Sequence, residues 1–238
     1  MKSVDVIIMA GGLGTRLRSV VSELPKCMAP VCEKPFLSYL LEYLRPYNIN
    51  KVILSVGYLR EHIFKFIDEV KCDYPYEFDY AIEETPLGTG GGTRLALKKA
   101  TMDNVVILNG DTLFNVNLDL FLDSHLKSGK DLSIALKPME NFERYGNVII
   151  DDGGRIVEFQ EKQYCAKGYI NGGVSIINRN TKLMEGCPEK FSFEVEIMQK
   201  QAREMNLNGY ISDGYFIDIG IPEDYAKANR EFDKLSFL

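Results

Sequence analysis

The chain has 238 residues, of which 45% are hydrophobic and 26% are charged, and its formal net charge is -6. This composition is that of an ordinary globular protein with a substantial core, and the acidic balance argues against a general nucleic-acid binder. The apolar run from Val4 to Ala10 is too short to cross a membrane, and it indicates a buried strand rather than a signal peptide.

Strands and helices alternate through the first half of the chain. Short apolar runs predict four strands, at residues 4–9, 51–56, 78–82 and 105–108. Apolar residues at helical spacing predict helices between Pro35 and Pro46, over residues 60–70, and from Gly88 to Ala100. The first strand is apolar almost throughout, which is typical of a sheet covered on both faces. This order predicts a largely parallel, doubly wound sheet.

In the second half, strands and helices no longer alternate, and several strand-like segments lie close together in the sequence. We expect strands at residues 132–136, 147–150, 155–159 and 169–177, with the turn at 151–154 joining two of them as a hairpin. Helices are predicted over residues 193–205 and 222–232. No repeat or polar linker interrupts the chain, so a single domain over residues 1–238 is the simplest prediction.

A glycine-rich loop, GGLGTRL at residues 11–17, follows the first strand directly. A loop in this place lets backbone N–H groups approach a phosphate closely, and Arg16, Arg18 and Lys26 add positive charge nearby. The loop is not a Walker motif, and Leu17 stands where a dinucleotide fingerprint has its third glycine. It is a candidate phosphate site, and the alternative is a flexible loop with solvated cations.

Two aspartates are candidates for a metal site. Asp111 follows the strand at 105–108, and Asp218 is the one charge in the apolar run from Tyr215 to Gly220. Ligands of open α/β sheets bind at the carboxyl ends of the strands, and phosphoryl chemistry usually needs a divalent metal held by carboxylates. The alternative for Asp111 is an ordinary turn residue.

Two polar segments of the second half are further candidates for ligand binding. Residues 158–162 (EFQEK) follow the hairpin, and residues 170–174 (INGGV) place glycines inside a strand, as at a bulge or a close approach to a ligand. An exposed strand end and packing glycines are the alternatives.

Cysteine and histidine chemistry is not expected. Cys27 and Cys32 have no histidine near them in the sequence, so core or surface cysteines are favoured over a nucleophile. The five cysteines form no CxxC pair, which argues for a reduced, cytoplasmic protein without a zinc site or disulfides. His62 and His125 are expected on helix surfaces, in contact with solvent.

In order along the chain, these motifs resemble those of the sugar-1-phosphate nucleotidyltransferase family. The resemblance covers nearly the whole chain and rests on GGLGTRL (11–17), Pro25-Lys26, PLGTGGG (86–92), NGD (109–111), EFQEK (158–162), NGGV (171–174) and FIDIG (216–220). Any one of them could arise by chance, whereas the ordered set is highly specific. Longer segments, such as EETPLGTGG (83–91), resemble the bacterial D-glycero-α-D-manno-heptose 1-phosphate guanylyltransferases within the family.

The resemblance implies an α/β fold with a Rossmann-like, doubly wound mixed sheet, mostly parallel, and an antiparallel β-rich sugar-binding part in the second half. It also implies Mg²⁺ and a displacement in which a sugar phosphate oxygen attacks the α-phosphorus of a nucleoside triphosphate and pyrophosphate leaves. The implied nucleotide-binding residues are Gly11, Gly12, Gly14, Thr15, Arg16 and Lys26, the last two on the β- and γ-phosphates. Asp111 and Asp218 would hold the metal, and Arg16, Lys26 and Asp111 would be catalytic. The sugar phosphate would contact Gly146, Glu161, Lys162, Asn171 and Gly172.

Two positions depart from the family pattern. Cys27 replaces the proline that usually follows the lysine. Many relatives bind the sugar phosphate with an arginine near the position of FSFE (191–194), where this chain has none, and Lys190 is the candidate substitute.

Two glutamates after the third predicted strand bear on the choice of base. Guanine presents N1–H and an exocyclic amine side by side, and one carboxylate can accept both hydrogen bonds. Adenine and uracil match a carboxylate less well. We therefore predict GTP, with Glu84 rather than Glu83 as the reader and with the turn at Gly88 leaving room for the flat base. The alternative is that both glutamates are solvated loop charges.

The predicted reaction joins GTP to D-glycero-α-D-manno-heptose 1-phosphate, giving GDP-heptose and pyrophosphate for cell-surface polysaccharide synthesis. The alternatives within the family are a mannose 1-phosphate guanylyltransferase and an N-acetylmuramate 1-phosphate uridylyltransferase. Outside catalysis, the alternative is an inactive nucleotide-sugar-binding regulatory module. The expected partners are the two substrates, without nucleic acid or membrane, and a homodimer is left open.

Overall fold

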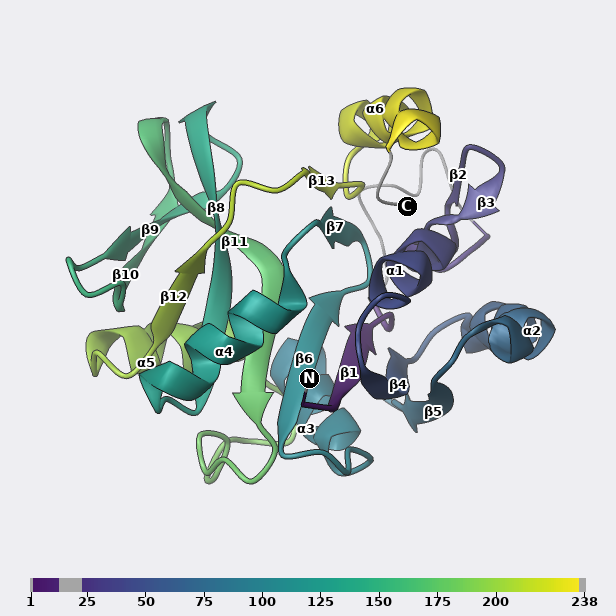
Figure 1. Cartoon of the computed structure of the whole chain (residues 1–238), viewed down its shortest axis with the longest axis horizontal. Coiled ribbons are helices and arrows are strands. Elements are labelled where there is room, and N and C mark those ends of the chain that lie inside the picture. The colour runs from purple at the N-terminus through teal and green to yellow at the C-terminus, as the bar shows by residue number, and fades with distance from the viewer. Residues whose placement is uncertain (1, 13–22, 236–238) are drawn as a thin grey trace.

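The computed structural model describes residues 2–12 and 23–235. Seven strands form the central sheet, and all neighbouring pairs are parallel except the two made by β11. The order is β12 (Asn208–Ile211), β8 (Leu132–Phe142), β11 (Cys165–Asn178), β6 (Asn104–Asn109), β1 (Val4–Met9), β4 (Ile49–Val56) and β5 (Glu77–Ile82). Figure 1 shows that β11 runs in the opposite direction to β1 and β6. The predicted fold class, a mostly parallel α/β sheet, is confirmed.

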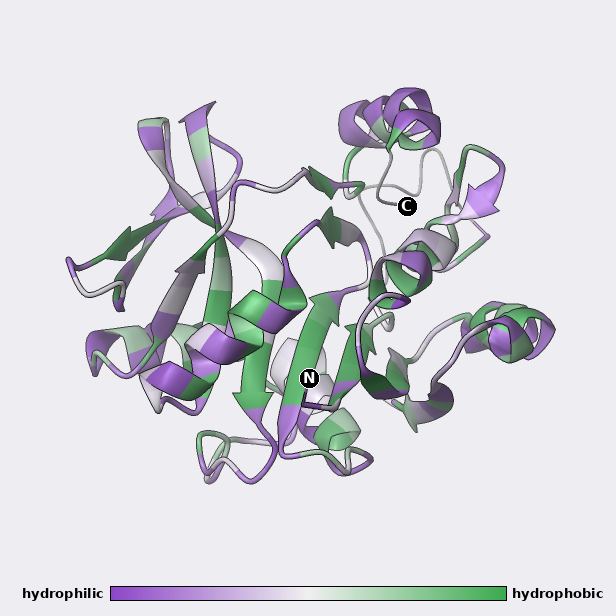
Figure 2. Ribbon diagram, in the orientation of Figure 1, coloured by the Kyte–Doolittle hydropathy of each residue, from purple (hydrophilic) through white to green (hydrophobic). Residues whose placement is uncertain are grey.

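Helices cover both faces of this sheet (Figure 1). One face carries α1 (Phe36–Leu44), α2 (Arg60–Val70) and α4 (Leu118–Ser128), and the other carries α3 (Gly88–Leu97), the π-helical turn η3 (Glu194–Gln199) and α5 (Lys200–Arg203). Strand β1 contributes Val6 and Ile8 to the first core and Ile7 to the second, because successive side chains of a strand point to opposite faces. The sheet interior is accordingly apolar in Figure 2, whereas α6 is mostly hydrophilic.

Short elements complete the fold. Three two-stranded ladders pair β2 (Pro30–Val31) with β3 (Lys34–Pro35), β7 (Thr112–Phe114) with β13 (Phe216–Asp218), and β9 (Gly146–Ile150) with β10 (Ile156–Lys162). The remaining helices are α6 (Pro222–Glu231) and the 3-10 turns η1 (Lys26–Met28), η2 (Lys71–Asp73) and η4 (Phe232–Lys234). Within the described residues, no helix is long and apolar enough to span a bilayer.

Most predicted elements are present, with bounds that shift by a few residues. The helix over residues 60–70 has the predicted bounds, and the hairpin at 151–154 is confirmed by the antiparallel pairing of β9 with β10. The helix predicted over 193–205 is instead a π-helical turn followed by one α-helical turn. The ladders of β2 with β3 and of β7 with β13 escaped prediction as pairs because strands of two or three residues carry no periodicity.

The ladder of β7 and β13 brings two distant parts of the chain together at the carboxyl ends of the parallel strands. Asp218 pairs with Thr112 in this ladder, and the N–H of Ile219 donates to the carbonyl of Asp111 at 2.9 Å. In Figure 1, the arrowheads of β1 and β6 point toward the same end of the sheet. The chain therefore places Asp111 and Asp218 side by side at the carboxyl ends of the parallel strands.

The expectation that His125 is solvated is wrong. Helix α4 buries Leu118, Phe121 and Leu122, and His125 lies on the same helical face, three residues beyond Leu122. The imidazole is 3% exposed, and its Nδ1 is hydrogen-bonded to Ser133 Oγ at 2.7 Å. Burial lowers the pKa of His125 from 6.5 to about 4. His62, by contrast, is exposed as expected.

This burial predicts an acid-sensitive contribution to stability. The unfolded chain protonates His125 near pH 6.5, and the folded protein does so only near pH 4, so the free energy of unfolding should fall as the pH decreases between these values. In urea titrations, His125→Gln should flatten this part of the pH profile. The matched variant His62→Gln should keep the wild-type profile. Equal pH dependence in wild type and His125→Gln would contradict the buried, neutral imidazole.

Candidate functional site

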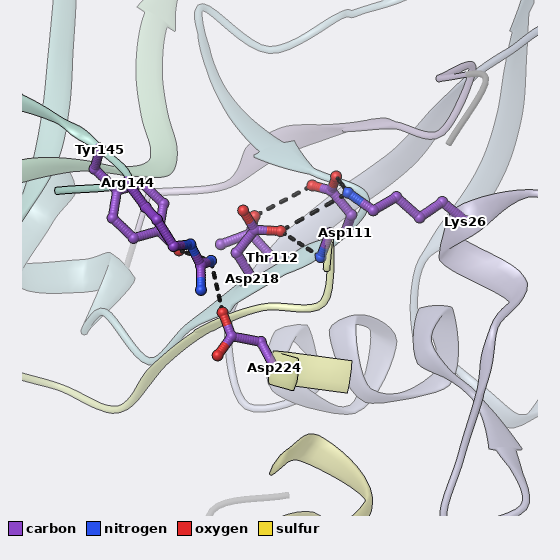
Figure 3. Close-up of polar contacts among 8 residues, drawn as sticks. Lys26, Asp111, Thr112, Arg144, Tyr145, Asp218 and Asp224 are labelled. Atoms are coloured by element: carbon purple, nitrogen blue, oxygen red, sulfur yellow. Dashed lines mark hydrogen bonds and ion pairs between the residues drawn. The ribbon is translucent and has the colours of Figure 1, made fainter. Parts of the chain in front are cut away.

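Three charged side chains meet at the carboxyl ends of the central strands (Figure 3). Lys26 begins the turn η1, and its Nζ forms ion pairs with Asp111 and, at 3.8 Å, with Asp218 Oδ1. The three side chains are 11%, 31% and 19% exposed, respectively, so solvent screens these pairs less than it screens surface ion pairs. The ammonium balances one of the two carboxylate charges.

Hydrogen bonds fix the orientation of both carboxylates. Thr112 Oγ1 donates to Asp111 Oδ1 at 3.2 Å, and the N–H of Gly220 donates to Asp218 Oδ1 at 2.7 Å. A Cβ at Gly220 would lie 2.5 Å from Lys26 Nζ and 2.6 Å from Asp218 Oδ1. A side chain at this position would displace the end of Lys26 or Asp218, so glycine favours their approach.

The two carboxylates suit a hard divalent cation. Mg²⁺ is usually held by one or two carboxylates together with substrate phosphates and water. No group of three acidic, histidine or cysteine residues forms a metal cage within the described residues. The ammonium of Lys26 lies where the two carboxylates converge, which marks the position as favourable for positive charge. Asp111 and Asp218 could thus hold Mg²⁺ once phosphates supply the remaining ligands.

A cavity of about 330 Å³ opens beside Asp111. The predicted nucleotide-binding residues Gly11, Gly12, Lys26 and Gly88 line it. At Gly110, which also lines the cavity, a Cβ would lie 2.5 Å from the carbonyl of Met9, so the two strand ends can approach only without a side chain there. Gly14, Thr15 and Arg16 lie outside the described residues.

The two glutamates after β5 have different surroundings, and Glu83 lines the cavity whereas the predicted reader Glu84 does not. Glu83 lines the cavity, where its carboxylate accepts from Ser55 Oγ at 3.2 Å and from the N–H of Leu87 at 3.0 Å. Glu84 lies outside the cavity lining, 78% exposed, and is paired with Arg60 at 3.4 Å. Glu83 directly follows β5, whereas Glu84 lies in the bend after it, and the two carboxylates therefore have different neighbours.

The glycine run at the start of α3 packs closely against the segment before η3. Gly88 has φ +72° and would place a Cβ 2.6 Å from the carbonyl of Phe191. Thr89 Oγ1 donates to the Glu194 carboxylate at 2.6 Å. Glu194 lines both the 330 Å³ cavity and a smaller one of about 20 Å³. A π-helical turn begins at Glu194, and such turns recur at functional sites. Sequence analysis quoted Thr89 within PLGTGGG (86–92) and Glu194 within FSFE (191–194) but gave neither side chain a role.

A second cavity, of about 340 Å³, includes Asp218 in its wall. The turn between β8 and β9 contributes Arg144 and Tyr145, and α6 contributes Asp224. Arg144 Nη2 donates to Asp224 Oδ2 at 2.7 Å, as drawn in Figure 3. Sequence analysis identified Asp218, in FIDIG (216–220), but did not predict its approach to Arg144, because only the tertiary fold brings the two segments together.

The residues predicted to bind the sugar phosphate lie on the antiparallel strands β9, β10 and β11. Gly146 and Lys162 are paired in the β9–β10 ladder, and Glu161 and Lys162 are exposed. Asn171 lines the 20 Å³ cavity, whereas a Cβ at Gly172 would clash with the ring of Phe114. The structure thus gathers these residues in one region of the fold without bringing them all into one cavity.

Cys27 and Lys190 are the residues at the two departures from the family pattern. Burial, reinforced by the charge of Asp111, raises the pKa of the Cys27 thiol to about 12, so it stays protonated and acts as a core residue. Lys190 is exposed and lines none of the three cavities.

Comparison with known proteins agrees with this geometry. A model of the nucleotidyl transferase family matches residues 5–234. The chain belongs to this family. It is 50% identical to the D-glycero-alpha-D-manno-heptose 1-phosphate guanylyltransferase of Aneurinibacillus thermoaerophilus, covering 95% of this chain and 97% of that protein. It is 40% identical to the protein of the same name from Campylobacter jejuni, covering 93% and 96% of the two chains.

This nucleotidyl transferase is also similar to solved structures. The crystal structure of HddC from Yersinia pseudotuberculosis is 37% identical, with a TM-score of 0.85 over 96% of this chain and 99% of that one. A second HddC structure, complexed with GMP-PN, is 38% identical and has a TM-score of 0.82, with the same coverage. The family assignment from sequence motifs is therefore confirmed.

Proposed function

We propose that the chain catalyses guanylyl transfer from GTP to D-glycero-α-D-manno-heptose 1-phosphate, producing GDP-heptose and pyrophosphate. The observation that carries the proposal is the meeting of Lys26, Asp111 and Asp218 at the wall of a glycine-lined cavity. Such a cluster suits a reaction between phosphates, which needs positioning and charge stabilisation more than covalent help from the protein. The named relatives support the choice of substrates.

In the proposed reaction, the triphosphate lies in the 330 Å³ cavity along the backbone of Gly11 and Gly12. An oxygen of the sugar phosphate attacks the α-phosphorus, and the bond to the β-phosphate oxygen breaks. Lys26 and Arg16 stabilise the negative charge on the departing pyrophosphate. Asp111 and Asp218 would hold Mg²⁺, which would supply positive charge to the reacting phosphates.

For the sugar, the proposal keeps the residues on the antiparallel strands. Glu161 accepts hydrogen bonds from sugar hydroxyls, Lys162 contacts a phosphate, and Gly146, Asn171 and Gly172 line the sugar pocket. The exposure of Glu161 and Lys162 leaves both side chains accessible to a substrate. GDP-heptose is an activated glycosyl donor, so we extend the proposal to a role in supplying cell-surface polysaccharide synthesis.

The proposed function is tested by incubating the protein with each of GTP, UTP, dTTP and ATP against heptose, mannose and N-acetylmuramate 1-phosphates. We expect pyrophosphate release to be fastest for GTP with heptose 1-phosphate, and mass spectrometry should detect GDP-heptose. A preference for mannose 1-phosphate would instead identify a mannose 1-phosphate guanylyltransferase. A preference for UTP would identify an N-acetylmuramate 1-phosphate uridylyltransferase. If no pair releases pyrophosphate while GDP-heptose still binds, the protein is a regulatory module.

The metal assignment is tested with Asp111→Asn and Asp218→Asn. Each change keeps the size of the side chain and removes one negative charge, so we expect turnover to fall about 10²- to 10³-fold. Circular dichroism should show a wild-type fold. The matched control is Asp123→Asn on the exposed face of α4, which should keep wild-type turnover. Near-wild-type activity of a site variant at limiting Mg²⁺ would remove that residue from the metal site.

For base recognition, we propose Glu83 as the guanine reader, with Glu84 as the alternative. Each carboxylate oxygen of Glu83 already accepts one bond within the protein, and each can accept a second. The existing bonds hold the carboxylate at the cavity wall, beside Gly11 and Gly92.

Glu83→Gln and Glu84→Gln separate the two readers. A glutamine at Glu83 would present a donor to a guanine donor, so we expect the preference for GTP over UTP, measured as the ratio of kcat/KM, to fall about 10- to 100-fold. Glu84→Gln should change this ratio less than about twofold, because it loses only an exposed ion pair. The opposite pattern would assign the role to Glu84, and no change in either variant would exclude a carboxylate reader.

A further inference from the structure

The ammonium of Lys26 lies where the proposed metal site would need Mg²⁺. Its Nζ contacts Asp111 Oδ2 and lies 3.8 Å from Asp218 Oδ1, as Figure 3 shows. A metal shared by the two carboxylates would take the oxygens that the ammonium contacts, at the short distances of about 2.0–2.1 Å that Mg²⁺ requires. Two cations at one position also repel each other strongly. The ammonium and the metal therefore exclude each other there.

The surroundings of the ammonium leave little room for a second cation beside it. The side chain of Lys26 is only 11% exposed. A Cβ at Gly220 would lie 2.5 Å from Lys26 Nζ, and the N–H of Gly220 donates to Asp218 Oδ1 at 2.7 Å. A metal that binds between the carboxylates must consequently displace the ammonium.

The side chain of Lys26 can move while its backbone stays in place. The backbone belongs to η1, where its carbonyl accepts from the N–H of Ala29 at 3.1 Å and where Cys27 and Met28 are buried. A lysine side chain is a flexible stem of four carbons that carries a point charge. Because Lys26 also lines the 330 Å³ cavity, its ammonium can reach a triphosphate there without a change of fold.

Charge determines when this movement is favourable. Without phosphates, the ammonium would exchange two carboxylate partners for water, so a metal ion alone has to displace charge-assisted contacts. A triphosphate offers the ammonium new anionic oxygens, and it also supplies ligands to the metal. The exchange is therefore favoured when the metal and the nucleotide bind together.

We propose that Lys26 is an internal competitor of the metal, which keeps free divalent cations off Asp111 and Asp218 until a triphosphate attracts its ammonium. The inference rests on the proposed function, because it concerns the metal and the nucleotide of that reaction. It adds a conformational switch, in which one side chain couples metal binding to nucleotide binding. By linkage, each ligand then raises the affinity for the other by the same factor.

The test is direct binding of Mn²⁺ without nucleotide, measured by electron paramagnetic resonance of the free ion. Lys26→Met keeps most of the side-chain length and removes the charge, so it should bind Mn²⁺ about 10- to 100-fold more tightly than wild type. Lys26→Arg keeps the cation and should bind as weakly as wild type. Adding Asp111→Asn to Lys26→Met should abolish the tight site.

Thermal unfolding provides a second measurement. Lys26→Met leaves two facing carboxylates without their cation, so its Tm in EDTA should be lower than that of wild type. Mn²⁺ should raise the Tm of this variant more than that of wild type, because a ligand that binds only the folded state stabilises it. With a saturating non-hydrolysable GTP analogue, the Mn²⁺ affinity of Lys26→Met should no longer exceed that of wild type.

The matched control is Lys99→Met, which removes a lysine paired with Asp79 at 3.4 Å and changes the net charge by the same amount. It should bind Mn²⁺ as weakly as wild type, and an equal gain in this control would reduce the effect to overall charge. Tight Mn²⁺ binding by wild type without nucleotide, or no gain in Lys26→Met by either measurement, would overturn the proposal. Wild-type pyrophosphate release from GTP would still support the proposed function in those cases.

Discussion

The ion pairs of Lys26 with Asp111 and Asp218 are the constraint on which the site depends. Two carboxylates that face one position repel each other unless a cation lies between them, and here the protein supplies that cation. The β7–β13 ladder, the hydrogen bond of Gly220 and the missing side chain at that residue all serve this arrangement. The folded chain therefore already contains a position selected for positive charge.

The antiparallel direction of β11 explains how the second half of the chain comes to lie near Lys26, Asp111 and Asp218. β11 runs antiparallel to β6 and β8, and its bulge after Asn171 lies near the carboxyl ends of the parallel strands. The parallel half contributes the glycine-lined cavity, and the antiparallel half with α6 contributes the second one. One mixed sheet thus carries two neighbouring cavities, with Asp111 in the lining of one and Asp218 in the lining of the other.

Much of this architecture could be predicted from the sequence, because the relevant signals are local. The apolar run of β1 predicted a strand covered on both faces, and the position of Asp111 after β6 predicted a carboxylate at the sheet edge. Asp218 could also be identified, since a lone charge in an apolar strand is conspicuous. These features depend on periodicity and on the general rule for strand ends.

The remaining features depend on which way a side chain points, which the sequence does not encode locally. Glu83 and Glu84 are chemically identical neighbours, and only the path of the chain after β5 turns one toward the cavity. His125 looked like a surface residue until the face of α4 was known. Arg144 and Asp224 lie far apart in the sequence, and no motif predicts the hydrogen bond between them.

The glycine run at the start of α3 has a consequence for how this motif is used in recognising function. Gly88, Gly90 and Gly91 each lie against Phe191 or Glu189, where a β-carbon would collide with neighbouring atoms of the same chain. Selection for folding alone would therefore retain these glycines, even in a descendant that no longer turned over substrate. The glycine run is a signature of the fold, and only the charged residues around it can distinguish a working enzyme from a silent copy.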